Sequence, residues 1–172
     1  MNKVIFYVAV SQDNYIADSD GGVDWLPQTP DPEDVVGFKV LMNRIGTIVM
    51  GSKSYLQILG FGPWAWTDKK TYVFTAQKLT SPMSCINFTH DSPQVFMNTF
   101  KQTGNTQDIW LLGGAVLAKS FAQDNLIDEI VLTIIPVNLG RGILLDISLD
   151  NFTLIAEKLC MDGIVQKVYA RK

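Results

Sequence analysis

Short, unbroken apolar runs alternate with amphipathic stretches along most of the chain. Such runs, bounded by polar or glycine-containing segments, are typical of strands buried on both faces of a parallel sheet. The runs that predict strands are residues 4–10, 47–50, 71–75, 85–88, 109–112 and 127–136. Helix start signals and helically spaced apolar residues predict helices over about 31–45, 91–103 and 114–123, and directly after Gly51.

The C-terminal part of the chain departs from this alternation. Residues 152–159 and 164–169 flank Met161-Asp162-Gly163, which is a hairpin signal. Alternating strands and helices followed by a hairpin predict an α/β fold with a mostly parallel sheet and an antiparallel C-terminal edge. Because no linker, repeat or low-complexity segment interrupts the pattern, we predict a single domain over residues 1–172.

Composition narrows the possible classes of function. The 172 residues are 47% hydrophobic, which is enough for a substantial core, and the net charge of -3 argues against a nucleic-acid partner. No apolar run approaches the roughly 20 residues that span a bilayer. A strand-like run begins at Val4, so we expect no signal peptide. Cys85 and Cys160 are too few for a disulfide framework or a zinc site. We therefore expect a cytoplasmic protein without a metal ion.

The ends of two predicted strands carry candidate ligand-binding residues. The apolar run 109–112 is followed by Gly113-Gly114, and a helix then begins. Side-chain-free residues at such a junction let a ligand approach the first N–H groups of the helix, where phosphate groups bind favourably. The run 47–50 repeats the arrangement, with Gly51 followed by hydroxyls and Lys53. The alternative is that each glycine only forms a tight strand-to-helix turn.

Two such junctions in one parallel sheet suggest a ligand that lies across the carboxyl ends of the strands. With them, the sequence resembles the dihydrofolate reductase superfamily. The resemblance is closest to the reductase domain of the bifunctional riboflavin-biosynthesis deaminase-reductases and their stand-alone relatives. Four segments carry it in the family's order: 8–17, Met50-Gly51-Ser52-Lys53-Ser54-Tyr55 against "M-G-R-K-T-Y", Leu111-Leu112-Gly113-Gly114, and Pro136-Val137-Asn138-Leu139-Gly140-Arg141-Gly142 against "P-V-L-L-G-x-G".

The resemblance implies a three-layer, dihydrofolate-reductase-like fold and an NADPH-dependent oxidoreductase. Hydride would pass to a small heterocyclic or sugar-derived substrate, as in 5-amino-6-(5-phosphoribosylamino)uracil reductases. By position, the pyrophosphate would be held by Gly113, Gly114, Ala115 and Val116. The second phosphate and the adenosine would contact Gly51, Ser52, Lys53 and Ser54, with Thr75 near the adenine ribose. The nicotinamide would be flanked by Ala9, Ile16 and Ala17.

The same resemblance implies the catalytic and substrate residues. Asp34 falls where the family places an acid that assists substrate protonation, and Thr133 where a threonine is linked to that acid. A carboxylate beside an apolar pocket suits this work because desolvation favours its protonated form. The alternative is that Asp34 only stabilises the first turn of a helix. Phe38 and Trp64 are candidate substrate contacts, although Trp64 could instead pack on the core of its own loop.

Departures from the family pattern leave alternative cofactors and alternative functions open. Ser52 replaces the usual arginine, so only Lys53 remains for a 2′-phosphate and NADH stays an alternative to NADPH. Lys69-Lys70 stand where a folate tail would need an arginine, which disfavours dihydrofolate reductase proper. A non-catalytic nucleotide-binding module is the other alternative. We also expect a homodimer formed at the hairpin 152–169, and we expect Gly114→Val to demand a backbone conformation that valine disfavours.

Overall fold

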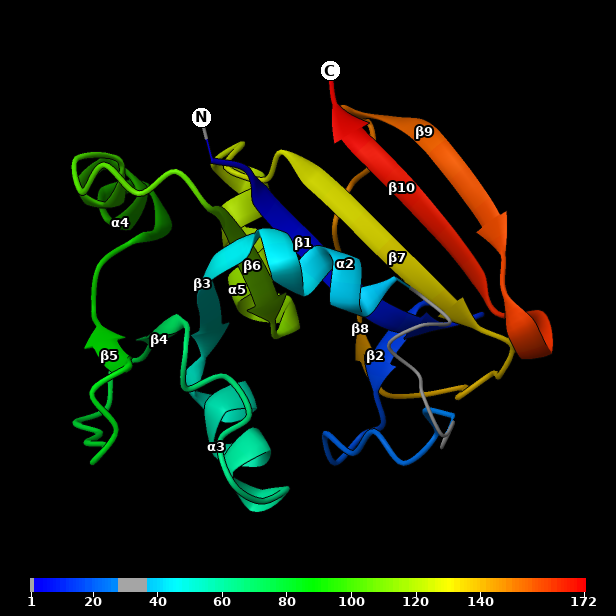
Figure 1. The fold of residues 1–172 in the computed structure, drawn as a ribbon. Coiled ribbons are helices and arrows are strands. Elements are labelled where there is room, and N and C mark those ends of the chain that lie inside the picture. Colours follow the sequence, from blue (N-terminus) through cyan, green and yellow to red (C-terminus); the bar gives the residue numbers. More distant parts are fainter. Residues whose placement is uncertain (1, 28–36) are drawn as a thin grey trace.

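The computed structural model describes residues 2–27 and 37–172. Over this part of the chain the main sheet has eight strands in the order β5-β4-β3-β6-β1-β7-β10-β9 (Figure 1). The parallel strands are β1 (Val4–Ser11), β3 (Ile45–Gly51), β4 (Lys70–Phe74), β5 (Ile86–Thr89), β6 (Asp108–Gly113) and β7 (Glu129–Ile135). The hairpin strands β9 (Phe152–Leu159) and β10 (Val165–Arg171) extend the sheet in antiparallel fashion. The predicted mixed sheet is thereby confirmed.

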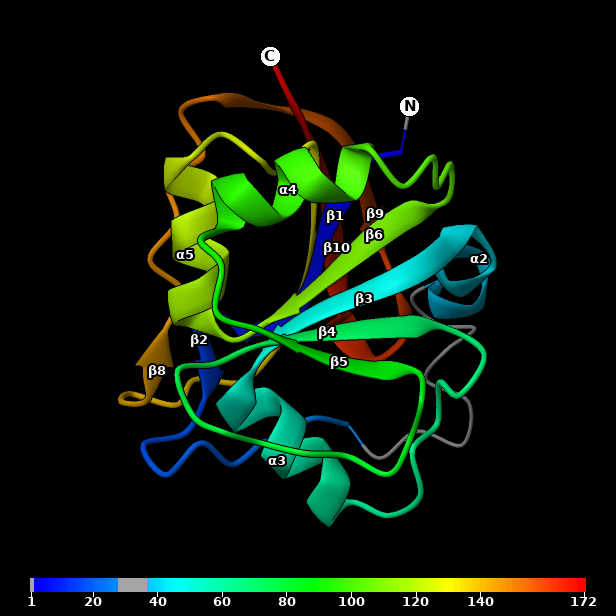
Figure 2. The ribbon, with the colours of Figure 1, turned by 90° about the vertical axis from the view of Figure 1, so that its left-hand side faces the viewer.

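Helices cover both faces of this sheet and complete a three-layer α/β fold. One face packs against α2 (Phe38–Arg44) and α3 (Ser52–Gly60). The other face packs against α4 (Pro93–Lys101) and α5 (Ala115–Gln123), and Figure 2 shows α2 on the side of the sheet opposite α4 and α5. A small second sheet joins β2 (Tyr15–Ala17) to β8 (Ile143–Leu144).

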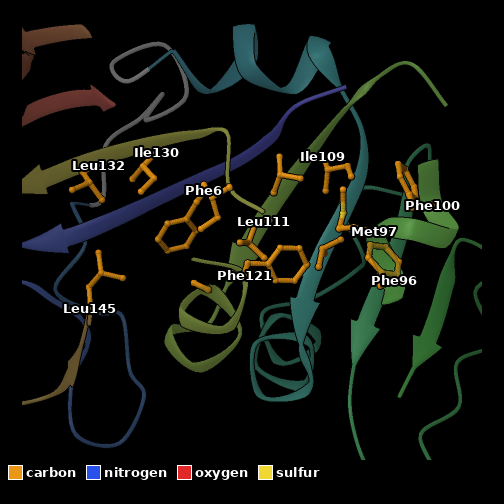
Figure 3. Packing of buried hydrophobic residues seen from close by; sticks show 14 of the residues in the cluster. Phe6, Phe96, Met97, Phe100, Ile109, Leu111, Phe121, Ile130, Leu132 and Leu145 are labelled. Atoms are coloured by element: carbon orange, nitrogen blue, oxygen red, sulfur yellow. The ribbon is translucent and has the colours of Figure 1, made fainter. Parts of the chain in front are cut away.

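The unbroken apolar runs arise because the central strands are buried on both faces. Successive side chains of a strand point to opposite faces, so Ile5 and Phe6 enter different cores. Phe6 lies in the core beneath α4 and α5, beside Leu111 and Phe121 (Figure 3). Ile5 lies in the core beneath α2 and α3. No helix in the described part of the chain is long and apolar enough to span a membrane.

Most predicted element boundaries agree with the structure within a few residues. The helix predicted from residue 91 begins at Pro93, because the hydroxyl of Ser92 accepts a hydrogen bond from Val95 N at 3.4 Å and caps it. The helix predicted over 31–45 is seen as α2, with Gly37 at its N-cap. The start signal predicted at Asp31 lies outside the described residues.

Candidate cofactor and substrate site

The predicted cofactor residues meet at one edge of the sheet. Thr75 follows β4, Gly51 ends β3, Gly113 ends β6, and Ala9 lies near the carboxyl end of β1. These four parallel strands are consecutive neighbours. At about 4.8 Å between strands they span roughly 14 Å, a length suited to an extended dinucleotide. The sequence motifs are therefore brought together by strand adjacency, although they are far apart along the chain.

The two glycine junctions touch each other. A Cβ atom built on Gly51 would lie 3.9 Å from the carbonyl oxygen of Gly113 and 4.0 Å from the nitrogen of Gly114. The peptide bond between Gly113 and Gly114 is cis. A Cβ atom on Gly114 would lie 3.5 Å from Oγ of Ser54, so the first turn of α3 stands directly beside the start of α5.

One expectation about this junction is wrong in its detail. The conformation that a side chain disfavours belongs to Gly113, whose φ is 119°. Gly114 has φ of -75° and is the N-cap of α5, a backbone geometry open to any residue. The sequence could not assign the strained position within the pair, because both residues are glycine and both were consistent with a tight turn.

Both helices at this edge begin without a capping side chain. Gly51 is the N-cap of α3 and Gly114 is the N-cap of α5, and neither helix receives a side-chain cap. Each helix is nine residues long, so the N–H groups of its first turn carry a partial positive charge. Lys53 and Val116 in these first turns are exposed. Two positive helix ends side by side form a cradle that suits a pyrophosphate.

The hydroxyl and the backbone N–H of Thr75 stabilise the turn that follows β4. Its hydroxyl accepts a hydrogen bond from Gln77 N at 3.0 Å, and its N–H donates to the carbonyl of Thr89 at 3.0 Å. The ring of His90 contacts the Thr75 carbonyl oxygen through Nδ1. Thr75 thus lies at the predicted edge, and its contact with an adenine ribose remains a prediction.

The predicted nicotinamide end is built from β1 and β2. Ile16 and Ala17 lie in β2, beside the turn 136–142. A Cβ atom on Gly142 would lie only 2.2 Å from the Ala17 carbonyl oxygen, so this close approach of backbones requires glycine. The same turn is held by Asp13, whose carboxylate accepts hydrogen bonds from Leu139 N and Gly140 N.

Asp13 was missed in the sequence, although it lies inside one of the resembling segments. Its carboxylate also accepts a hydrogen bond from the Ser11 hydroxyl at 2.6 Å. This bond, joined by the backbone N–H groups of Gly140 and Leu139, lowers the pKa of Asp13 from 3.8 to about 2. Because the ionised carboxylate accepts from three donors, it fastens the first loop of the chain to the turn 136–142.

Of the two predicted catalytic residues, the structure describes only Thr133. Asp34 lies outside the described residues. Thr133 is buried in β7, where it pairs with Ala9 of β1 and Gln166 of β10. The side-chain amide of Gln166 donates hydrogen bonds to Thr133 Oγ1 at 3.2 Å and to Tyr7 Oη at 3.4 Å. Tyr7 and Gln166 were not recognised as site residues in the sequence, where Tyr7 stands within an apolar run and Gln166 is one of several polar residues in the second strand of the hairpin.

The candidate substrate residues Phe38 and Trp64 belong to one chain of aromatic rings. Phe38 lies 5.8 Å from Tyr7 and 5.3 Å from Trp110 between ring centroids. Trp66 connects Trp110 to Trp64. Trp64 is only 7% exposed, so the structure favours the alternative in which its loop packs on its own core. Phe38 is half-buried beside Tyr7, and its contact with a substrate remains a prediction.

No group of His, Cys, Asp and Glu side chains within residues 2–27 and 37–172 could hold a metal ion. The parallel sheet, its paired glycine junctions and its covering helices together define a dihydrofolate-reductase-like α/β protein. The chain belongs to the RibD C-terminal domain family, whose model matches residues 2–157.

Three similar proteins match nearly the whole of this chain. The uncharacterized protein YwjB of Bacillus subtilis (strain 168) is 33% identical over 157 residues, covering 91% of this chain and 89% of YwjB. The uncharacterized protein YyaP of the same organism is 32% identical, covering 97% of this chain and 94% of YyaP. A crystal structure of a Shewanella sp. PV-4 protein, assigned provisionally to riboflavin biosynthesis, superposes with a TM-score of 0.86. The two sequences are 29% identical, and the superposition covers 100% of this chain and 99% of the Shewanella chain.

Proposed function

We propose that this protein is an NADPH-dependent reductase that transfers hydride to a small heterocyclic or sugar-derived substrate. The observation that carries the proposal is the contact between the two glycine junctions, which brings the starts of α3 and α5 together at the carboxyl edge of the sheet. Two adjacent helix N-termini favour a pyrophosphate, and a dinucleotide is the common ligand with that group.

The residues at this edge fit the cofactor. Gly51 and Gly114 carry no side chain, and a Cβ atom on either would meet only ordinary contacts of 3.5 to 4.0 Å, so glycine at both positions leaves the cradle open to a ligand. Lys53 is an exposed cation in the first turn of α3 and could contact a 2′-phosphate. Bound NADPH would supply the hydride. The chain would hold the phosphates at α3 and α5 and orient the nicotinamide against Ala9, Ile16 and Ala17.

The substrate site proposed here lies on the face of β1 and β7 beneath α2. Thr133 presents a hydroxyl there beside Ala9, where the nicotinamide is expected. The proposed role of Asp34 as a proton donor rests on the family resemblance. Membership of the RibD C-terminal domain family makes 5-amino-6-(5-phosphoribosylamino)uracil the first substrate to test.

The experiment is a titration of the purified protein with NADPH and, in parallel, NADH, followed by nicotinamide fluorescence. We expect saturable binding of NADPH and weaker binding of NADH, because Lys53 offers a charge to the 2′-phosphate. Turnover is then measured as loss of nicotinamide absorbance with 5-amino-6-(5-phosphoribosylamino)uracil and with dihydrofolate. Failure of both nucleotides to bind at millimolar concentration would overturn the proposal.

A non-catalytic nucleotide-binding module is the second candidate. Ser52 favours it, because the first residue of α3 brings a small hydroxyl where the family usually has an arginine. Both candidates predict nucleotide binding, so turnover separates them. Cofactor oxidation that requires a substrate and is abolished in Asp34→Asn would exclude the binding module.

A further inference from the structure

A polar pocket of about 200 Å³ lies at one end of the small sheet formed by β2 and β8. Ala17 of β2 pairs with Ile143 of β8 in antiparallel fashion, so the residues after Ala17 lie beside the residues before Ile143 (Figure 1). The pocket is lined on one side by Asp18, Ser19 and Asp20, and on the other side by Leu139 and Arg141. None of these lining residues is a predicted cofactor or substrate residue.

Hydrogen bonds hold the wall that is formed by the loop after β2. Asp18 Oδ1 accepts hydrogen bonds from Asp20 N at 2.9 Å and from Gly22 N at 2.7 Å. The carbonyl oxygen of Gly21 accepts another from the side-chain amide of Gln57, in α3, at 2.6 Å. The loop is therefore folded on itself and tied to a helix. The carboxylate of Asp20 accepts no hydrogen bond from any described residue, so it is available to a ligand.

The opposite wall is held by Asp13. Its carboxylate accepts hydrogen bonds from Leu139 N and Gly140 N, which fixes the turn that carries Arg141. Within residues 2–27 and 37–172, the guanidinium of Arg141 has neither an ion pair nor a hydrogen bond. Leu139 is half-buried and adds an apolar surface. Because both walls are held in place before any ligand arrives, the pocket is largely preorganised for binding.

Opposite charges line this pocket without forming an ion pair. The carboxylates of Asp18 and Asp20 border the same space as the guanidinium of Arg141, yet no salt bridge joins them. A guanidinium presents several N–H donors in a planar fork that matches a carboxylate, whereas a carboxylate only accepts hydrogen bonds. A ligand that satisfies both walls therefore carries an anionic group at one end and a positively charged donor at the other.

The balance of charge favours such a dipolar ligand over a phosphorylated sugar. The lining holds two carboxylates and one guanidinium, so negative charge is in excess. A dianionic phosphate bound to Arg141 would be repelled by both carboxylates, whereas an ammonium group would be attracted by them. The volume of the pocket lies below the roughly 300–1,000 Å³ that is typical of sites for drug-sized ligands, so its occupant is small.

We propose that this pocket binds a small dipolar molecule of the amino acid class, with its carboxylate on Arg141 and its ammonium group on Asp18 and Asp20. The side chain of Leu139 contacts the methylene groups between the two charges. The proposal does not depend on the proposed function, because the pocket contains no predicted cofactor residue. A bound ligand connects the loop after β2 to the turn 136–142 and therefore stabilises the folded protein.

The test is calorimetric titration of the full chain in the absence of nucleotide. The dipolar probes are glycine, β-alanine and 4-aminobutyrate, which separate the two charges by increasing lengths. Propionate and propylamine carry one charge each and serve as matched control ligands. We expect a millimolar dissociation constant for the best dipolar probe, because ion pairs at a site open to water are weak. We expect each singly charged control to bind at least about tenfold more weakly. The best probe at saturation should also raise the thermal midpoint.

Two variants test the two ends of the pocket. Arg141→Gln removes the partner of the carboxylate, and Asp20→Asn removes a partner of the ammonium group. Each should weaken the best probe at least about tenfold, since each leaves one charge of the ligand without its partner. Neither should change the thermal midpoint without the probe, because neither side chain makes a hydrogen bond in the described part of the chain. Lys101→Gln, which removes an exposed positive charge on the remote helix α4, should leave binding unchanged (Figure 2).

Four results overturn the inference. The first is the absence of binding by every dipolar probe at tens of millimolar. The second is wild-type affinity in Arg141→Gln or in Asp20→Asn. The third is binding of propionate or propylamine as tight as that of the best dipolar probe. The fourth is tighter binding of ribose 5-phosphate than of any dipolar probe, which would identify a sugar-phosphate site instead. All four are measured without NADPH, so they are distinct from a failure of the proposed cofactor site.

Discussion

The carboxylate of Asp13 accepts a hydrogen bond from the backbone N–H of Gly140 at 2.6 Å, across 127 residues of sequence. A second hydrogen bond, from Leu139 N at 3.1 Å, completes a clamp in which the Asp13 carboxylate binds two consecutive backbone N–H groups. The turn 136–142 is thereby fastened to the loop between β1 and β2. Since β2 carries Ile16 and Ala17, the clamp positions the segment that we expect to flank the nicotinamide.

This clamp should respond to acid. The folded-state pKa of Asp13 is about 2, below its ordinary value of 3.8, so the ionised form is favoured by folding. The stabilisation is fully present above about pH 4 and is lost as the pH falls toward 2. We expect Asp13→Asn to lower the thermal midpoint at pH 6, because an amide N–H₂ would replace one of the accepting oxygens. The difference from the wild type should shrink between pH 4 and pH 2.

Thermal melts of both proteins across this pH range check the prediction. Asp20→Asn serves as the control, because no described residue donates a hydrogen bond to its side chain. A deficit in Asp13→Asn that stays constant down to pH 2 would contradict an ionised clamp.

The backbone contact between Gly142 and Ala17 gives a second prediction. Gly142→Ala should lower stability by about 1–3 kcal/mol through overpacking, because its Cβ would lie 2.2 Å from the Ala17 carbonyl oxygen. It should also weaken NADPH binding by displacing Ala17. Gly140→Ala is a matched control: its φ of 71° is also positive, yet its Cβ would meet nothing within 4 Å.

The thermal midpoint and the NADPH dissociation constant are measured on both variants. If Gly140→Ala and Gly142→Ala behave alike, backbone strain alone explains the result and the contact with Ala17 has no separate effect.

The strands could be predicted from sequence because burial on both faces leaves a continuous apolar run, as in residues 109–112. The glycine junctions could be predicted because Gly113-Gly114 directly follows such a run. Their mutual contact depends on β3 pairing with β6, which are separated along the chain by β4, β5 and two helices. Strand order of this kind is set by packing of the whole sheet.

Contacts between distant side chains were also beyond sequence reasoning. Gln166 reaches Tyr7 across 159 residues, and only the antiparallel register of β10 on β7 brings them together. In another register Gln166 would lie on the opposite face, because a shift by one residue reverses the side chains of a strand. The role of Trp64 was ambiguous for a similar reason, since an aromatic side chain in a loop can contact a ligand or pack on the protein core.

The outer strand β9 supports the proposal of a homodimer. Its large apolar side chains are exposed, with Leu154 at 45%, Ile155 at 59% and Leu159 at 73%. An edge strand with unpaired backbone groups and apolar side chains favours pairing with another chain. We expect light scattering to give the mass of a dimer at tens of micromolar. Ile155→Lys combined with Leu159→Lys should give a monomer that retains its fold.

Circular dichroism of the double variant supplies the control for folding, and Val95→Lys tests an exposed apolar residue on the remote helix α4. A wild-type protein that is monomeric at these concentrations would contradict the proposal, as would a double variant that remains dimeric.

The N-cap of α5 offers the sharpest test of the cofactor site. Gly114 has φ of -75°, and its Cβ would make an ordinary contact of 3.5 Å with Ser54 Oγ, so Gly114→Ala should fold with little loss of stability. If a pyrophosphate rests on this cradle, the added methyl group blocks its approach to the helix N–H groups. Two or three charge-assisted hydrogen bonds, each worth about 1.5–3 kcal/mol, would be lost or weakened. We therefore expect NADPH affinity to fall on the order of a hundredfold.

Gly60→Ala, at the far end of α3 with nothing within 4 Å of its Cβ, should leave affinity unchanged. The thermal midpoint and the dissociation constant are read on the same samples. Normal NADPH binding by a folded Gly114→Ala protein would mean that the glycine pair forms only a turn.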